Sequence, residues 1–583
     1  MRRLHLPGRL LPVLAVLGLV ATSAAPAAAE VTTGHHPETV RLLAKAAADE
    51  CFAGIGVDYP AGPPCAVGRE KVNQSYVWGL AKAGRQLWFG TGANVLCLKP
   101  EGYDVGEPIL NDDYACEFAN SQPARQNPSL PANLGDHRMP EVYTYDLASE
   151  RLTERTADIT AASPADAALL RSTAGLRSGT AHQGVVLLGG PSLVAGVNLF
   201  AFDTFTGRFL GSTNLGAYEN IRHFAIADGV LYAGVGLGTN GGDSGRVLRW
   251  TGDRTDPFSF TEVADLPTQV ADLTVHQGRI YVSTWPKAIV GAGVTGADGT
   301  GTGTAATGVG TGAVDTTDLA SIWMSPLLAD GEPGLTPGDA HSWTQVWSAA
   351  EYEPDPVVRR AYALGGLASY GGHLYWGTMH VPLQATALHL AVYPPKNQAQ
   401  LAATVQNTQR AFVVFRGRDF DGADRAVETL YGESQLPAFD PAANGGVGGW
   451  QTRPTGMTPV YGGSGFNDPY NLYAWKMLVA GGRLYIGTMD FAYIALGGEM
   501  PAPETGATAV DPPTFGSDLW SFDAPGRPAR AVDRTGFGNP LNQGVRTMVA
   551  DGSTVYLGMA NPMNLRTDPA GPLGGWELLE LTR

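Results

Sequence analysis

Apolar and polar residues alternate along this chain in short segments that meet at glycine turns, and the same arrangement recurs. Residues 81–92, 369–380 and 479–490 read AKAGRQLWFGTG, SYGGHLYWGTMH and VAGGRLYIGTMD. Alternation on both sides of a one- or two-residue turn is typical of a β-hairpin. The copies align on one residue that follows the turn: Trp88, Leu187, Tyr232, Tyr281, Tyr375, Tyr485 and Tyr556.

A third strand is expected after each hairpin, and a fainter fourth strand after some of them. The third strands are 141–147, 198–207, 246–253, 321–327, 411–417, 518–523 and 576–581, and the clearest fourth strands are 208–214, 260–267 and 342–348. Leu187, Tyr232 and Tyr281 are spaced by 45 and 49 residues. This spacing is the length of a four-stranded propeller blade.

We therefore predict an all-β fold over residues 71–583, a seven-bladed β-propeller of four-stranded antiparallel blades with long insertions on one face. A single blade cannot bury both of its faces, so blades stack around an axis, and closure of the ring protects the sheet edges. A β-sandwich does not repeat a hairpin at this period, and β-helix rungs are shorter. Since the chain ends on a third strand, the last blade should take its outer strand from the segment before Tyr76.

The third strands also resemble those of quinoprotein-type propellers. The segments NLFAFDTFTGRF at 198–209 and DLWSFD at 518–523 are similar to the ALD-x-x-TG pattern of those repeats. The resemblance implies the blade architecture and no specific family. Quinoproteins usually carry a tryptophan shortly after TG, whereas Gly207 is followed here by Arg208, Phe209 and Leu210, and the chain has no adjacent cysteine pair. No cofactor is therefore predicted.

Most of the extra length falls between the second and third strands, and such connections emerge on one face of a propeller. The insertions are 93–140, 291–317, 380–410 and 490–516. Long loops gathered on one side of a rigid scaffold are typical of a binding face. The glycine- and threonine-rich tract 291–317 is favoured as a surface excursion, with a mobile lid as the alternative.

The first 29 residues have the pattern of a secretory signal peptide, with three arginines, an apolar run and small residues before Glu30. The apolar run is too short for a membrane anchor, so we expect a secreted, extracellular protein without membrane insertion. Removing this segment lowers Lys+Arg from 39 to 36 against 55 acidic residues, which gives a net charge of −19. So acidic a chain is a poor partner for nucleic acid.

Four cysteines form two local pairs, and proximity favours the disulfides Cys51–Cys65, in an N-terminal segment 30–70, and Cys97–Cys116. The other connectivities stay open at this point. No CxxC motif is present, so zinc binding and thiol redox chemistry are not predicted.

The position ten residues before each alignment mark is where the innermost strand begins, at the mouth of the axial channel. It is occupied by Trp78, Arg177, Arg222, Ala271, Gly365, Trp475 and Arg546. Guanidinium groups suit carboxylate, sulfate or phosphate, and indole faces suit a sugar ring or another planar ligand. The alternative is that the arginines pair with aspartates such as Asp272 and that the tryptophans are packed between blades.

A second set of candidates stands where the second strand reaches the loops: Asn94, Trp285, His380, Asp490 and Asn561. His380 and Asp490 occupy matching positions, and Tyr493 follows Asp490 by three residues. A histidine and a carboxylate are the groups from which general acid–base catalysis is assembled. Each of them singly is more often structural.

Other signals are absent or weak. The chain has no GxSxG, HExxH, P-loop or Rossmann motif in a suitable context. His182, His223 and His276 have unequal offsets from the alignment marks, which argues against a four-histidine iron site. Asp112 and Asp113 could hold calcium, but they lack the alternating ligand spacing of a known loop, and a solvated loop is favoured.

The sequence thus favours a protein, expected to be a monomer, that binds or cleaves an extracellular acidic polymer, with a uronic-acid polysaccharide as the leading substrate. In a lyase, Arg177, Arg222 and Arg546 would neutralise the carboxylate, His380 would take the neighbouring proton and Tyr493 would assist the leaving oxygen. In a hydrolase, Asp490 would act as acid or base. The rival is a non-catalytic lectin-like or protein-docking propeller, and a third possibility is a quinone-type oxidoreductase.

Overall fold

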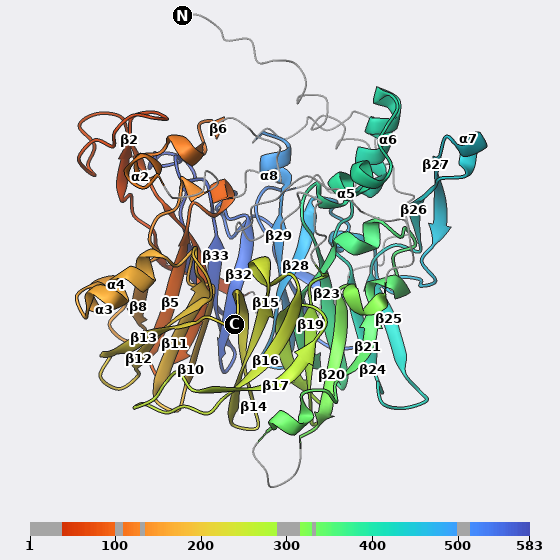
Figure 1. Ribbon diagram of the computed structural model, residues 1–583, viewed down its shortest axis with the longest axis horizontal. Coiled ribbons are helices and arrows are strands. Elements are labelled where there is room, and N and C mark those ends of the chain that lie inside the picture. The colour runs from red at the N-terminus through yellow and green to blue at the C-terminus, as the bar shows by residue number, and fades with distance from the viewer. Residues whose placement is uncertain (1–37, 99–108, 129–133, 288–314, 329–333, 498–513) are drawn as a thin grey trace, which may run out of the picture.

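The computed structural model describes residues 38–98, 109–128, 134–287, 315–328, 334–497 and 514–583 (Figure 1). The fold is a β-propeller built from four-stranded antiparallel sheets. The first sheet contains β4 (Gln74–Ala83), β5 (Gln86–Ala93), β8 (Val142–Asp146) and β9 (Arg151–Glu154), paired in that order. The predicted all-β propeller of four-stranded antiparallel sheets is therefore confirmed.

The sheets that follow along the chain have the same order of strands. They are β10 (Ser178–His182), β11 (Val185–Pro191), β12 (Val197–Asp203) and β13 (Phe209–Leu215); β14 (Asn220–Ala227), β15 (Val230–Leu237), β16 (Ser244–Trp250) and β17 (Phe260–Leu266); β18 (Val270–His276), β19 (Arg279–Thr284), β20 (Ser321–Leu327) and β21 (Thr344–Ser348); β22 (Tyr362–Tyr370), β23 (His373–His380), β24 (Val414–Arg418) and β25 (Ala426–Tyr431); β28 (Asn471–Ala480), β29 (Arg483–Asp490), β30 (Leu519–Phe522) and β31 (Arg530–Asp533).

The last sheet joins the two ends of the chain. It contains β32 (Gly544–Asp551), β33 (Thr554–Ala560) and β34 (Glu577–Thr582), and its outer strand is β1 (Thr39–Lys45). In this pairing Val40 lies opposite Leu581 and Leu42 opposite Leu579. The outer strand therefore comes from before Tyr76, as the sequence predicts, and lies within the segment 30–70. The inner strands pack in succession, and β32 packs against β4, so the ring is closed.

The alignment residues of the hairpin repeat form the core between neighbouring sheets. Trp88, Tyr232 and Tyr375 are completely buried. Trp88 on β5 lies 4.9 Å, between ring centroids, from Phe202 on the next sheet. The repeat recurs because each sheet must bury the same kind of face against its neighbour.

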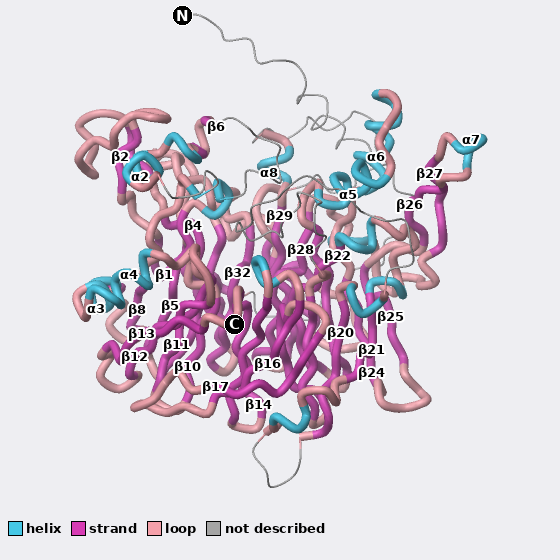
Figure 2. The backbone as a smooth tube through the Cα atoms, viewed as in Figure 1, coloured by secondary structure: helices cyan, strands magenta, loops and turns pink. Residues whose placement is uncertain are grey.

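The insertions project from the upper end of the sheets in the view of Figures 1 and 2. They include the hairpin β2 (Glu50–Phe52) and β3 (Arg69–Lys71), the short β6 (Ile109–Leu110) and β7 (Ala115–Cys116), helices α2 (Gln122–Gln126), α5 (Gln384–Val392), α6 (Gln398–Thr408), α7 (Ala443–Gly446) and α8 (Ala492–Ala495), and the hairpin β26 (Gln435–Asp440) and β27 (Gly449–Pro454). Helices α3 (Thr156–Thr160) and α4 (Pro164–Arg171) lie beside the first two sheets. Most of the tract 291–317 lies outside the described residues.

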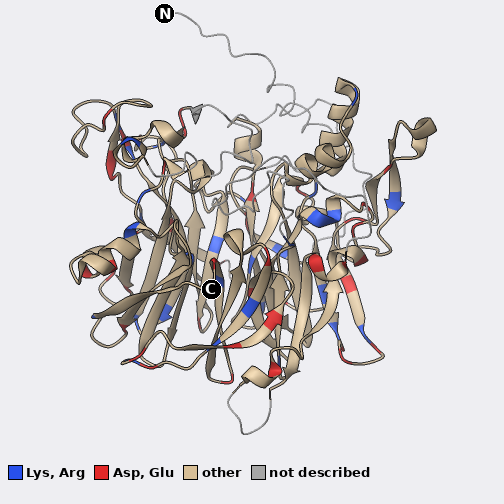
Figure 3. Ribbon diagram, in the orientation of Figure 1, with Lys and Arg blue, Asp and Glu red and all other residues tan. Residues whose placement is uncertain are grey.

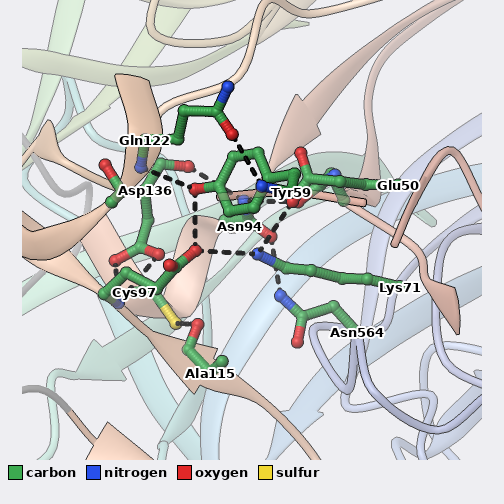
Figure 4. Close-up of polar contacts among 12 residues, drawn as sticks. Glu50, Tyr59, Lys71, Asn94, Cys97, Ala115, Gln122, Asp136 and Asn564 are labelled. Atoms are coloured by element: carbon green, nitrogen blue, oxygen red, sulfur yellow. Dashed lines mark hydrogen bonds and ion pairs between the residues drawn. The ribbon is translucent and has the colours of Figure 1, made fainter. Parts of the chain in front are cut away.

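Both predicted disulfides, Cys51–Cys65 and Cys97–Cys116, are present. A buried ionic network beside them ties the N-terminal hairpin to the first insertion (Figure 4). Lys71 is completely buried, with its Nζ 3.8 Å from Glu50 Oε1 and 3.8 Å from Glu117 Oε2. Tyr59 donates its hydroxyl to Glu117 at 2.9 Å. Burial lowers the pKa of Lys71, so the amine depends on these carboxylates for its charge.

Candidate functional site

A cavity of about 330 Å³ lies at the centre of the ring. All the inner strands, from β4 to β32, contribute to its wall. Its polar and aromatic lining consists of Trp78, Lys82, Arg177, Ser178, Thr180, Arg222, His223, Phe224, Asp272, Trp285, Trp475, Lys476, Arg546 and Thr547. The structure thus brings the three predicted arginines and the three predicted tryptophans to one place.

β-Bulges explain why the predicted positions face this cavity. The pairing of β14 passes from Ile221 to His223, that of β28 from Ala474 to Lys476 and that of β32 from Val545 to Thr547. The unpaired residues are therefore Arg222, Trp475 and Arg546, and equivalent interruptions isolate Trp78 and Ala271. An extra residue bends the strand and re-aims its side chain, so the bulge turns two consecutive residues of each of these strands toward the axis. Arg177 instead directly precedes β10.

Arginines and tryptophans of the cavity wall form pairs between neighbouring sheets. The guanidinium carbon of Arg177 lies 5.6 Å from the ring centroid of Trp78, and that of Arg546 lies 5.2 Å from Trp475. The contact of Arg222 with Trp285 is closer, at 3.8 Å. Stacking of this kind orients the guanidinium and leaves its edge available for hydrogen bonds.

Side-chain amides hold two of the arginines in place. Arg177 Nη1 donates to Asn220 Oδ1 at 3.1 Å, and Arg222 Nε donates to Gln269 Oε1. Trp285 donates its Nε1–H to the carbonyl oxygen of Leu364 at 3.1 Å, which fixes the ring beneath Arg222. These side chains are therefore positioned before any ligand enters.

The residues directly after three of the bulge positions form a cluster that the sequence analysis did not single out as a site. They are His223, Asp272 and Lys476. Lys476 Nζ lies 3.0 Å from Asp272 Oδ2 and 3.1 Å from His223 Nδ1, and His223 Nε2 lies 3.1 Å from Asp272 Oδ1. The three residues come from three different sheets. The signal in the sequence was their position directly after Arg222, Ala271 and Trp475.

Burial controls the protonation of this cluster. It lowers the pKa of His223 to about 4, against the opposing effect of Asp272, so the imidazole is neutral at pH 7. It also lowers the pKa of Lys476, and the nearby Arg546 acts in the same direction, while Asp272 opposes both. The cavity therefore contains a neutral imidazole and an amine whose charge is held by one carboxylate.

The cavity is strongly basic in an acidic protein. Its wall carries five cationic residues, Lys82, Arg177, Arg222, Lys476 and Arg546, and one carboxylate, Asp272, which gives a local formal charge of 5 − 1 = +4. The whole chain has a net charge of −16. Acidic and basic segments are interspersed along the outer strands and loops in Figure 3. Positive potential focused in a cavity attracts anions.

His380 does not line this cavity. It borders a separate space of about 10 Å³ near Arg410, with its Nε2 2.9 Å from Thr378 Oγ1 and its ring 4.4 Å from that of Tyr362, between centroids. Burial, reinforced by Arg410, lowers the pKa of His380 to about 3. The predicted base is thus a neutral, packed side chain that does not line the cavity of Arg177, Arg222 and Arg546.

Asp490 and Tyr493 also lie apart from the cavity lining. Asp490 is buried, accepts a hydrogen bond from the backbone N–H of Ala492 at 3.0 Å, and has its pKa raised by burial and by the neighbouring Asp468 and Asp518. The hydroxyl group of Tyr493 donates a hydrogen bond to Asp113 Oδ1 at 3.3 Å. The predicted catalytic residues His380, Asp490 and Tyr493 therefore do not line the cavity that contains the three predicted arginines.

The two predicted asparagines are buried and serve the loops. Asn94 donates to the carbonyl oxygen of Asp136 at 2.8 Å and accepts from Asn564 at 2.6 Å, whereas Asn561 donates to the carbonyl oxygen of Leu573 at 2.9 Å. Neither residue lines the cavity.

The described residues contain neither a metal-binding cluster nor a membrane-spanning helix. No group of three histidine, cysteine or acidic residues in these ranges is arranged to hold a metal ion. No helix in the same part of the chain is long and apolar enough to cross a membrane.

Comparisons with known proteins give distant likenesses to solved structures only. No family model and no curated protein matches the chain. Similar solved structures include the polysaccharide lyase Uly1, at 8% identity over 94% of this chain and 99% of that one with a TM-score of 0.40. The β-propeller domain of the Trilobed protease from Pyrococcus furiosus is 8% identical over 87% and 93%, with a TM-score of 0.34. These are likenesses of fold alone.

Proposed function

We propose that this protein is secreted and binds an extracellular acidic polymer, with a uronic-acid polysaccharide as the leading class, by admitting a carboxylated end or side unit into the axial cavity. The observation that carries the proposal is the local charge of +4 in the cavity wall of a chain with a net charge of −16. The cavity volume, about 330 Å³, falls at the lower end of the range for small-ligand sites. It suits one terminal unit and excludes a whole chain segment.

The wall offers both parts of a sugar-acid site. Arg177, Arg222 and Arg546 present fork-like donors to a carboxylate, and Trp78 and Trp475 present flat apolar surface to a ring. The two disulfides are of the kind that persists outside the cytosol, which supports secretion.

If the polymer is cleaved by a lyase reaction, the proton acceptor belongs in the cavity. His223 is neutral at pH 7 and lies one residue after Arg222, so it replaces His380 as the candidate base in this proposal. A base of this kind would take the proton beside a carboxylate that the arginines neutralise. His380, Asp490 and Tyr493 stand outside the cavity, and this separation favours the alternative, a lectin-like propeller that binds without turnover.

The test uses the purified mature chain, residues 30–583, and a panel of uronic-acid oligosaccharides with neutral oligosaccharides of equal length. Calorimetry should detect binding of acidic oligosaccharides that weakens as salt concentration rises, because salt screens the attraction. An Arg222→Gln variant should bind about 10-fold or more weakly, since a charge-assisted hydrogen bond contributes about 1.5–3 kcal/mol. Arg418→Gln is the matched control, because Arg418, the last residue of β24, is 53% exposed and pairs with Asp419.

A product assay distinguishes a lyase, a hydrolase and a lectin-like protein. Ultraviolet absorbance of an unsaturated sugar indicates a lyase, new reducing ends without that absorbance indicate a hydrolase, and binding without either product favours the lectin-like version. Equal affinity for acidic and neutral oligosaccharides, or equal loss in both variants, would remove the cavity as the binding site.

A further inference from the structure

Among the described residues of the cavity wall, Lys476 carries the only primary amine within hydrogen-bond distance of both a carboxylate and an imidazole. It follows the bulge residue Trp475 on β28, and its side chain is 13% exposed. Lys82, the other lysine of the wall, instead pairs with Asp551 at 3.1 Å. A simple structural ion pair would not need to border a cavity.

The surroundings of Lys476 match what an amine nucleophile requires. The amine must lose a proton before it can attack, and Asp272 at 3.0 Å and His223 at 3.1 Å are placed to receive one. Burial and Arg546 both lower the pKa of the ammonium group, which makes that loss easier. A lysine desolvated next to another cationic group is a recognised way of activating an amine.

We propose that Lys476 forms a Schiff base with an anionic carbonyl compound, a 2-oxo or aldehydo acid whose carboxylate is held by the arginines of the cavity. The inference rests on the proposed anion binding and adds the reacting group of the ligand. The open-chain form of a uronic acid and a small 2-oxo acid both carry the required carboxylate and carbonyl.

The reaction balances without an oxidant or reductant. Lys476 Nζ gives one proton to Asp272 or His223, its lone pair forms the C–N bond, and the carbonyl electron pair moves to oxygen, which takes up that proton. The nitrogen then gives a second proton to the same pair of residues, which pass it to the new hydroxyl group. This group leaves as water, and the freed nitrogen lone pair forms C=N. One ammonium ion and one carbonyl compound thus become one protonated Schiff base and one water.

Borohydride trapping tests the proposal, because hydride reduces C=N to a stable secondary amine. The mature chain is incubated at pH 7 with glyoxylate, reduced, and analysed by intact mass and by peptide mapping. The expected result is one carboxymethyl increment on the peptide that carries Lys476, with labelling at least 10-fold above that of Lys287, which is 48% exposed. Excess acetate, which has a carboxylate and no carbonyl, should compete.

The Lys476→Arg variant keeps the charge and should abolish the label at this position. Equal labelling of Lys476 and Lys287 would overturn the inference. So would binding of glyoxylate in calorimetry, competed by acetate, with no adduct after reduction, and that outcome would leave anion binding intact. An adduct on Lys476 in a protein that binds no acidic oligosaccharide would instead uphold this inference and reject the polymer as ligand.

Discussion

Replacing Arg410 with methionine should destabilise the protein more than any loss of a surface ion pair. Arg410 forms a two-point contact with Glu353, with its Nε 2.8 Å from Oε2 and its Nη2 3.2 Å from Oε1. The side chain of Arg410 is 5% exposed and that of Glu353 is completely buried. Arg410 also donates to the carbonyl oxygens of Asn407 at the end of α6 and of Pro437 on β26.

The size of the effect follows from the charge left behind. Removing one partner of a buried ion pair costs about 3–5 kcal/mol, because the other charge stays desolvated without compensation. An unfolding entropy of about 2.1 cal/mol/K per residue gives roughly 1.1 kcal/mol/K for a chain of about 550 residues. The expected fall in Tm is therefore about 3–4 °C.

A double-mutant cycle in thermal unfolding, followed by circular dichroism at one scan rate, measures the pair. Arg410→Met should lower Tm, and Glu353→Gln in the Arg410→Met background should recover part of the loss, because the uncompensated carboxylate is gone. The control Arg418→Met removes an exposed pair and should shift Tm by about 1 °C or less. A Tm of Arg410→Met equal to that of the control, or additive losses in the double variant, would refute the reasoning.

Three further results are expected. Replacing both cysteines of the Cys51–Cys65 disulfide, which closes a loop with a sequence separation of 14, should cost about 3 kcal/mol, measured as a lower Tm than that of the wild-type protein under non-reducing conditions and as no difference when both proteins are unfolded in reductant. Burial lowers the folded pKa of His380 to about 3 against 6.5 for the ordinary side chain, so the stability linked to its neutral form is lost as pH falls from about 6.5 toward 3. In His380→Gln up to one proton fewer is taken up on unfolding, so Tm should fall less steeply over that pH range. Gly190→Ala places a Cβ 1.7 Å from the carbonyl oxygen of Gly175 and should cost about 1–3 kcal/mol, whereas Gly526→Ala enters open space and should change stability by less than about 0.5 kcal/mol; equal effects would contradict the packing argument.

Some of the architecture could be predicted because its causes are local in the chain. The alternation around Trp88 or Tyr485 reflects two faces of a strand, and this period of two is visible in any window of a few residues. The fourth strands expected at 208–214, 260–267 and 342–348 are β13, β17 and β21. Disulfides between cysteines 14 and 19 residues apart followed from proximity.

The site could be predicted only in part. Counting ten residues back from each hairpin found Arg177, Arg222 and Arg546, because equivalent positions in a repeat occupy equivalent positions in space. The same counting passed over His223, Asp272 and Lys476, since a strict alternation would point the next residue away from the axis. A bulge breaks that alternation, and its presence depends on pairing with the neighbouring strand.

The sequence by itself determined the repeat, its strands, the paired cysteines and the basic positions within an acidic chain. The sequence placed the closing outer strand before Tyr76, but the tertiary structure decided that this strand is β1 and how it pairs with β34, more than 500 positions away. It also decided the separation of His380 from the arginines of the cavity. The physical reason is that strand alternation is a property of neighbouring residues, whereas bulges, closure and the convergence of side chains depend on contacts between sheets.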